Sequence, residues 1–141
     1  MKAQRLVGVS LVLISALIAA ACSGGGAPDA EKAIKSTRSG DLNVTLSNSA
    51  GELRNGENDL FVAFTDASGE PIDVGAASLN FQMAAMGTMP EMNSKAVLAT
   101  TDVPGKYHAR VEFQMSGTWE AIINYEGPKG TGQTRMTVNA K

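Results

Sequence analysis

Cysteine and histidine each occur only once in this chain of 141 residues, as Cys22 and His108. A single thiol cannot form an internal disulfide, and an odd cysteine in an exported chain needs another role. The sequence also lacks the G-x-S-x-G, H-E-x-x-H and P-loop patterns that mark common catalytic sites. We therefore predict that the protein is not an enzyme.

Positive charge is scarce as well. Without Lys2 and Arg5, which belong to the leader described below, ten basic residues remain against fourteen acidic ones, a formal charge of −4. Proteins that bind nucleic acid usually present a basic face to the phosphates. The composition thus excludes nucleic acid as a partner, and it also argues against electrostatic attachment to anionic lipid.

Long apolar runs are absent apart from residues 6–20, which follow Lys2 and Arg5 and lead into three alanines. This run is short for a spanning helix, and its small residues are typical of a signal-peptide cleavage site. We predict a signal peptide over residues 1–21.

Cys22 follows the alanines directly, and this segment resembles a bacterial lipobox. The resemblance implies cleavage before Cys22 and acylation of its sulfur and new amino group, so that lipid chains anchor the protein to a membrane. The alternative is ordinary cleavage near Ala21, which leaves Cys22 as a free thiol. We expect a protein of the cell envelope that faces the periplasm or the exterior, with residues 22–40 as a flexible, glycine-rich linker.

Aromatic residues make up only 5% of the chain, and no convincing amphipathic helix follows the linker. Instead, apolar residues alternate along short segments separated by Gly, Pro, Asn or Asp, most clearly over residues 106–115. About seven such strands predict an all-β fold over residues 41–141, an immunoglobulin-like antiparallel β-sandwich. We expect residues 59–66 to form a central strand and residues 95–99 a short one. Six aromatic residues should fill much of the core: Phe61, Phe64, Phe81, Tyr107, Phe113 and Trp119.

Methionine, in contrast, is concentrated in residues 81–92, FQMAAMGTMPEM, where it recurs at every third position. In a strand such residues would point to opposite faces, and Gly87 and Pro90 disfavour a helix. Only a loop would let their sulfur atoms converge. Met83 continues the apolar face of the preceding strand and is expected in the core.

Thioether sulfur is a soft ligand that selects Cu(I). The three loop methionines, Met86, Met89 and Met92, are therefore the candidate metal ligands, with Met115 and His108 as possible auxiliary ones. The alternative is structural, because methionine commonly fills irregular gaps in a core. In that case the loop caps the end of the sandwich, and we expect Met136 in the core under either interpretation.

Three motifs resemble the YtkA-like/FixH-like domain: M-P-E-M at residues 89–92, P-G-K-Y at 104–107 and F-Q-M-S-G-T-W at 113–119. The resemblance covers about residues 41–138. It implies an immunoglobulin-like sandwich outside the cytoplasm, in a family whose members occur as small lipoproteins, in oxidase assembly and fused to heavy-metal efflux components.

Two functions follow from these observations. The first is a non-catalytic envelope lipoprotein that binds Cu(I) through the methionine loop, for buffering or for hand-over to a metal-transfer partner. The second is a structural or protein-interaction module whose methionine loop is core or an apolar contact patch for another envelope protein.

Overall fold

The computed structural model describes residues 30–141, which fold into two antiparallel β-sheets packed face to face. The predicted signal peptide, Cys22 and the first part of the predicted linker lie outside the described residues. Within them the structure has nine strands: β1 (Lys32–Ser39), β2 (Leu42–Asn48), β3 (Gly56–Thr65), β4 (Ala76–Met83), β5 (Met92–Lys95), β6 (Val97–Thr100), β7 (Lys106–Phe113), β8 (Gly117–Gly127) and β9 (Gly130–Ala140).

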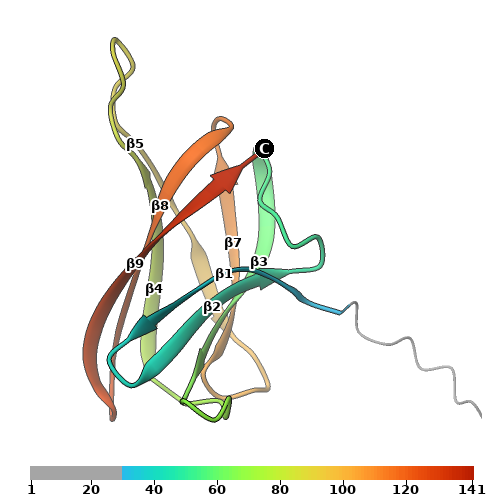
Figure 1. The fold of residues 1–141 in the computed structure, drawn as a ribbon, viewed down its shortest axis with the longest axis vertical. Coiled ribbons are helices and arrows are strands. Elements are labelled where there is room, and N and C mark those ends of the chain that lie inside the picture. Colours follow the sequence, from blue (N-terminus) through green and yellow to red (C-terminus); the bar gives the residue numbers. More distant parts are fainter. Residues whose placement is uncertain (1–29) are drawn as a thin grey trace, which may run out of the picture.

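One sheet has the strand order β1-β2-β3-β7-β6 and the other β5-β4-β8-β9 (Figure 1). The predicted all-β antiparallel sandwich is confirmed, with nine strands rather than seven. Strand β3 lies in the middle of its sheet, as the apolar character of residues 59–66 predicts. In the described part of the chain no helix is present that could cross a membrane.

Strand β1 is a departure from the prediction, since residues 32–39 were expected in the flexible linker. This strand pairs with β2 through its backbone, for example Ser36 with Thr45, and its register shifts between Ala33 and Lys35. An edge strand needs little apolar side-chain burial when its backbone hydrogen bonds hold it to a neighbour. The polar composition of residues 32–39 therefore gave no sign of a strand, because this strand is held by its backbone and not by buried side chains.

The strand expected over residues 95–99 is instead divided between the two sheets. Strand β5 pairs with β4 and strand β6 pairs with β7, and Ala96 lies between them. Ala96 is buried and donates its N–H to the carbonyl oxygen of Leu79, 3.0 Å away. The chain thus changes sheets within one residue, which no periodicity in so short a segment could show.

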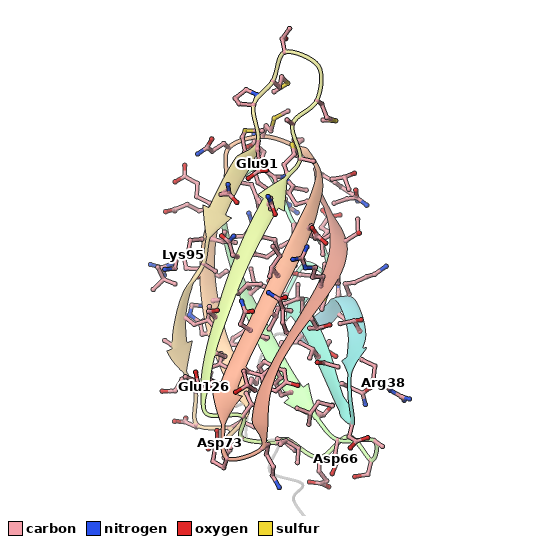
Figure 2. All side chains as sticks on the ribbon, turned by 90° about the vertical axis from the view of Figure 1, so that its left-hand side faces the viewer. Arg38, Asp66, Asp73, Glu91, Lys95 and Glu126 are labelled. Atoms are coloured by element: carbon pink, nitrogen blue, oxygen red, sulfur yellow. The ribbon has the colours of Figure 1, made fainter. Side chains whose placement is uncertain are left out.

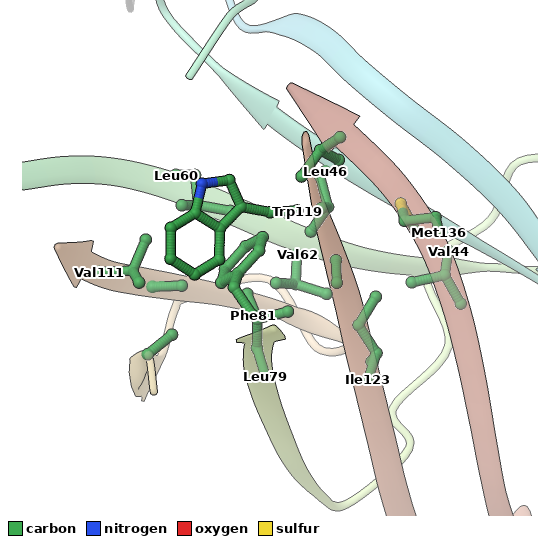
Figure 3. Close-up of a cluster of buried hydrophobic side chains, with 14 of the residues drawn as sticks. Val44, Leu46, Leu60, Val62, Leu79, Phe81, Val111, Trp119, Ile123 and Met136 are labelled. Carbon is green, nitrogen blue, oxygen red and sulfur yellow. The ribbon is translucent and has the colours of Figure 1, made fainter. Parts of the chain in front are cut away.

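The core lies between the sheets and is built from the inward residues of six strands, β2, β3, β4, β7, β8 and β9, together with Leu53, Val74 and Ala96 from the connections (Figure 3). The ring of Phe113 packs edge-to-face against that of Phe81 and at a tilt against that of Trp119, with centroid distances of 4.9 and 5.1 Å, and all three side chains are buried. Burying each such side chain contributes roughly 1.5–3 kcal/mol. Met136 is buried as predicted. Phe61 is the exception among the expected core aromatics, because it lies on the outer face of its sheet beside His108.

One end of the sandwich carries the features that matter for the site. There the connection between β4 and β5 projects beyond the sheets, next to the β7–β8 turn and the C-terminus (Figure 1). The C-terminal residue is tied to the β2–β3 connection, because the N–H of Lys141 donates to the carbonyl oxygen of Leu53 at 2.9 Å. The end of the sandwich from which the β4–β5 connection projects is therefore held together by backbone hydrogen bonds between segments that are distant in the sequence.

Candidate functional site

The projecting segment, residues 83–92, forms what we call the methionine hairpin. At its tip the backbones of Met86 and Met89 exchange two hydrogen bonds, with N–O distances of 3.1 and 2.9 Å. Gly87 and Thr88 make the turn between them, and Gly87 has a φ of +57°. Glycine at the first of two turn residues is typical of the tight hairpin turns that match strand twist. The turn therefore places Met86 and Met89 directly opposite each other.

These two methionines, the tip pair, lie in water rather than in the core. The side chain of Met86 is 58% exposed and that of Met89 is 42% exposed. Directly opposite residues in a β-ladder have Cβ atoms about 4.5–5.5 Å apart. Each methionine side chain has three rotatable bonds, so both sulfur atoms can reach a single ion between them.

At the base of the hairpin Met83 and Met92 form a second cross-strand pair. Met83 is only 3% exposed, as predicted for a core residue, and Met92 is half-buried and packs against the core. Met92 is thus the first residue of β5 rather than part of an irregular loop. Three residues of strand rise separate the base from the tip, about 10 Å. The structure therefore divides the three predicted ligands into an exposed pair and a single partly buried residue.

Met115 approaches the base of the hairpin from the β7–β8 turn. Its side chain packs against the core, and its carbonyl oxygen accepts a hydrogen bond from the indole N–H of Trp119 at 3.2 Å. Met83 and the neighbouring Gly117 are in close contact. Figure 2 shows sulfur atoms gathered at this end of the sandwich, above Glu91 and along the hairpin. Met115, which was predicted as a possible auxiliary ligand, thus lies near the base of the hairpin.

His108 is not brought to this end. It lies on the outer face of β7, where its Nε2 atom is 3.1 Å from a carboxylate oxygen of Asp59 and its ring contacts Phe61. Five residues of β7 separate it from Phe113 at the hairpin end, about 17 Å of strand rise. The predicted auxiliary role of His108 would need a rearrangement of the hairpin over the opposite sheet.

Harder metal ligands are not gathered elsewhere in residues 30–141, where no three His, Cys, Asp or Glu side chains could hold one ion. In residues 83–92 the one charged side chain is Glu91, which accepts a hydrogen bond from the amide of Asn93 at 3.2 Å. The hairpin therefore offers thioether sulfur with little competing charge. Such a donor set suits a soft monovalent ion and not Zn²⁺, Mg²⁺ or Ca²⁺.

Comparison with known families places this geometry in context. The model of the YtkA-like family matches residues 36–124, more than half of the chain. The chain belongs to the YtkA-like family. The match begins within β1 and ends within β8, and so includes the whole methionine hairpin. No curated protein and no solved structure matches the chain.

The YtkA-like domain carries one site feature that sequence reasoning missed, the pairing of Met86 with Met89. The signal was present, because Gly87-Thr88 is a two-residue Gly-X sequence of the kind that closes a tight β-hairpin. The regular spacing of the methionines predicts instead an irregular loop in which the sulfur atoms of Met86, Met89 and Met92 converge. In the structure the turn pairs the methionines two by two.

Proposed function

We propose that this YtkA-like protein is a non-catalytic, lipid-anchored protein of the cell envelope that binds Cu(I) at the tip of its methionine hairpin. Met86 and Met89 are the ligands. Met92, the third predicted ligand, lies about 10 Å away at the base of the hairpin and packs against the core, so it joins the tip pair only if the hairpin rearranges. The protein buffers the metal or passes it to a partner protein. Cu(I) is cargo in this proposal and not a resident cofactor.

The observation that carries the proposal is the arrangement of the tip pair. If the two methionines were core fillers, they would be buried like Met83, yet both are exposed. Their backbone hydrogen bonds hold them opposite each other before any metal arrives. A preformed pair of soft donors lowers the ordering cost of binding, which is the general advantage of preorganisation.

Hand-over follows from the exposure of the same pair. Two thioether ligands leave the remaining coordination positions of Cu(I) open, and the tip projects from the sandwich into solvent (Figure 1). A partner can therefore supply its own soft ligands one at a time while the hairpin ligands leave. An ion buried among the core side chains would have no such route.

A second function is supported by the apolar character of the tip. Residues 84–90 are all exposed and carry no charge. An exposed apolar segment can be the contact surface for another protein, and methionine is common at adaptable binding surfaces. In that case the hairpin docks on an envelope protein and needs no metal.

Titration with Cu(I) under reducing, anaerobic conditions separates the two functions. The methyl signals of Met86 and Met89 in an NMR spectrum should shift on Cu(I) addition, while that of Met136 should not. The double variant M86L/M89L keeps the apolar volume of the tip and removes both sulfur atoms, so it should lose most of the affinity. M136L is the matched control in the core.

Two results would overturn the copper proposal. One is a titration that leaves the tip methyl signals in place. The other is an M86L/M89L variant that binds Cu(I) as tightly as the unsubstituted chain. Retained docking on an envelope partner by M86L/M89L, together with loss through M86E/M89E, would favour the contact surface instead.

The location is proposed from the leader and Cys22. Metabolic labelling with a radioactive fatty acid should mark the protein, and the Cys22→Ser variant should take up no label and leave the membrane fraction. An unlabelled chain that is still exported would support cleavage near Ala21 with Cys22 left as a free thiol.

A further inference from the structure

The six methionines of the described residues differ in access to solvent, although all carry the same thioether. The tip pair is exposed, Met92 and Met115 are half-buried, and Met83 and Met136 are buried. Oxidation of methionine to the sulfoxide follows the exposure of the sulfur atom. Access alone therefore ranks Met86 and Met89 as the first sulfur atoms that an oxidant reaches.

The consequence of oxidation also differs between tip and core. A sulfoxide adds a polar S–O group, which at the tip would be hydrated by water. At Met83 or Met136 the same group would be buried among apolar side chains without a hydrogen-bond partner, at a cost of several kcal/mol in general. The backbone bonds that close the tip involve no side-chain atom. Oxidation of the tip pair thus changes its chemistry and leaves the sandwich folded.

We propose that Met86 and Met89 form a modification site that hydroperoxides oxidise to methionine sulfoxide, and that this oxidation ends soft-metal binding at the hairpin. The loss of metal binding, which is the second half of this proposal, rests on the proposed function. The selective oxidation of the tip pair, which is the first half, does not depend on it. The sulfur lone pair attacks one peroxide oxygen, the S–O bond forms and the O–O bond breaks. Sulfur loses two electrons, and the peroxide gains them. With hydrogen peroxide, the leaving hydroxide takes the proton from the newly formed S–OH group and becomes water, which leaves the neutral sulfoxide.

The modification can be reversed and so can act as a switch. Thiol-dependent methionine sulfoxide reductases return the sulfoxide to the thioether: the S–O bond breaks, two thiols are oxidised to a disulfide, and the oxygen leaves as water. An exposed turn is open to such an enzyme, whereas a buried methionine becomes available only after unfolding. The tip pair therefore combines ready oxidation with ready repair.

A time course with hydrogen peroxide on the full chain tests the first half. Tandem mass spectrometry assigns the added oxygen to individual methionines. Met86 and Met89 should be oxidised about ten-fold faster or more than Met83 and Met136, because the latter are shielded. Equal rates at the tip and in the core would overturn the proposal, as would a tip no faster than Met92 and Met115.

Folding is checked in the same samples by the tryptophan fluorescence of Trp119, which is fully buried in the core. Its emission should not change while the tip pair is oxidised. A red shift that accompanies tip oxidation would contradict the expectation that the sandwich survives. In M86L/M89L the fast phase of oxygen uptake should vanish and the slow phase should remain.

The second half is tested with Ag(I), a soft monovalent ion that does not change oxidation state. The reduced chain should bind Ag(I), the chain oxidised at the tip should not, and treatment with a sulfoxide reductase should restore binding. If tip oxidation is selective but the reduced chain binds no Ag(I), the proposed function fails and the modification site stands. If Ag(I) binds equally before and after tip oxidation, the switch is wrong while metal binding stands.

Discussion

The terminal methyl carbon of Met83 lies 3.0 Å from the position that a Cβ atom on Gly117 would occupy. Gly117 opens β8 with a φ of +139°, a backbone conformation that L residues with side chains rarely adopt. Met83 thus fills the space that the absent side chain leaves. This contact joins the base of the methionine hairpin to the start of β8, directly after the β7–β8 turn.

Replacing Gly117 with alanine should therefore destabilise the protein for two reasons. The new Cβ meets the methyl group of Met83, and the backbone at this position is strained for any residue but glycine, a cost of about 1–3 kcal/mol. Urea unfolding should show the loss as a lower midpoint. Gly40→Ala is the matched control, because Gly40 also has a positive φ but nothing lies within 4 Å of its Cβ position. An equal loss in both variants would show that the Met83 contact contributes nothing.

Met83 and Met86 allow a direct comparison of core and tip within one hairpin. Met83→Ala should lower the free energy of unfolding by about 2–5 kcal/mol, because it opens a cavity in the core. Met86→Ala should change it by no more than about 0.5 kcal/mol, as expected for an exposed side chain. Chemical denaturation of both variants measures the difference. A large loss in Met86→Ala would mean that the tip packs against the protein and is not a free pair of ligands.

The alternation of apolar and polar residues predicted the strands and their buried faces more reliably than any other feature of the sequence. Residues 106–115 read as a strand with five residues on one face: Tyr107, Ala109, Val111, Phe113 and Met115. The first four are buried in β7, which ends at Phe113, whereas Met115 follows in the turn and is half-buried. Met83 was assigned to the core by the same rule, and the structure confirms it. Alternation works here because one face of each sheet is covered and the other meets water.

The features that could not be predicted depend on backbone pairing and not on side-chain pattern. Strand β1 contains one large aliphatic residue, Ile34, and is held by its ladder with β2. Strand β3 is apolar on both faces, so its composition did not show that Phe61, which alternates with the buried Leu60 and Val62, lies on the outer face. There Lys106 and His108 contact its ring. The pairing of Met86 with Met89 likewise follows from a turn whose type decides which residues face each other.

Asp66 should make stability depend on pH in the acid range. One of its carboxylate oxygens accepts hydrogen bonds from the Ser68 hydroxyl and from the N–H groups of Ser68 and Glu70, at 2.6–3.0 Å. These bonds, that of the Ser68 hydroxyl above all, lower the pKa of Asp66 in the folded state. A lowered pKa stabilises the fold above the ordinary carboxyl pKa, near 3.9, and this contribution is lost as pH falls through the folded-state value.

The variant Asp66→Asn keeps an oxygen acceptor but cannot titrate. Its melting temperature should lie below that of the unsubstituted protein at about pH 6, and the difference between the two melting temperatures should narrow as the pH falls through the lowered pKa of Asp66 and the carboxylate becomes protonated. Differential scanning calorimetry at several pH values measures the melting temperatures of the variant and of the unsubstituted protein. Glu112→Gln, which changes an exposed carboxyl on β7, serves as the control. A difference that stays constant with pH would show that the charge of Asp66 contributes nothing.

Cu(I) binding at the tip pair should not depend on pH in the mildly acid range. A thioether carries no proton to lose, whereas an imidazole ligand must be deprotonated before it can bind a metal. The Cu(I) affinity should therefore be the same at about pH 5 and about pH 7, and His108→Gln should leave it unchanged at both. This variant tests the predicted auxiliary role directly, because His108 is engaged with Asp59 on the opposite sheet and away from the hairpin. An affinity that falls towards pH 5 in the unsubstituted protein, but not in His108→Gln, would place His108 among the ligands. The hairpin would then have to fold over the outer face of β7 when it binds the metal.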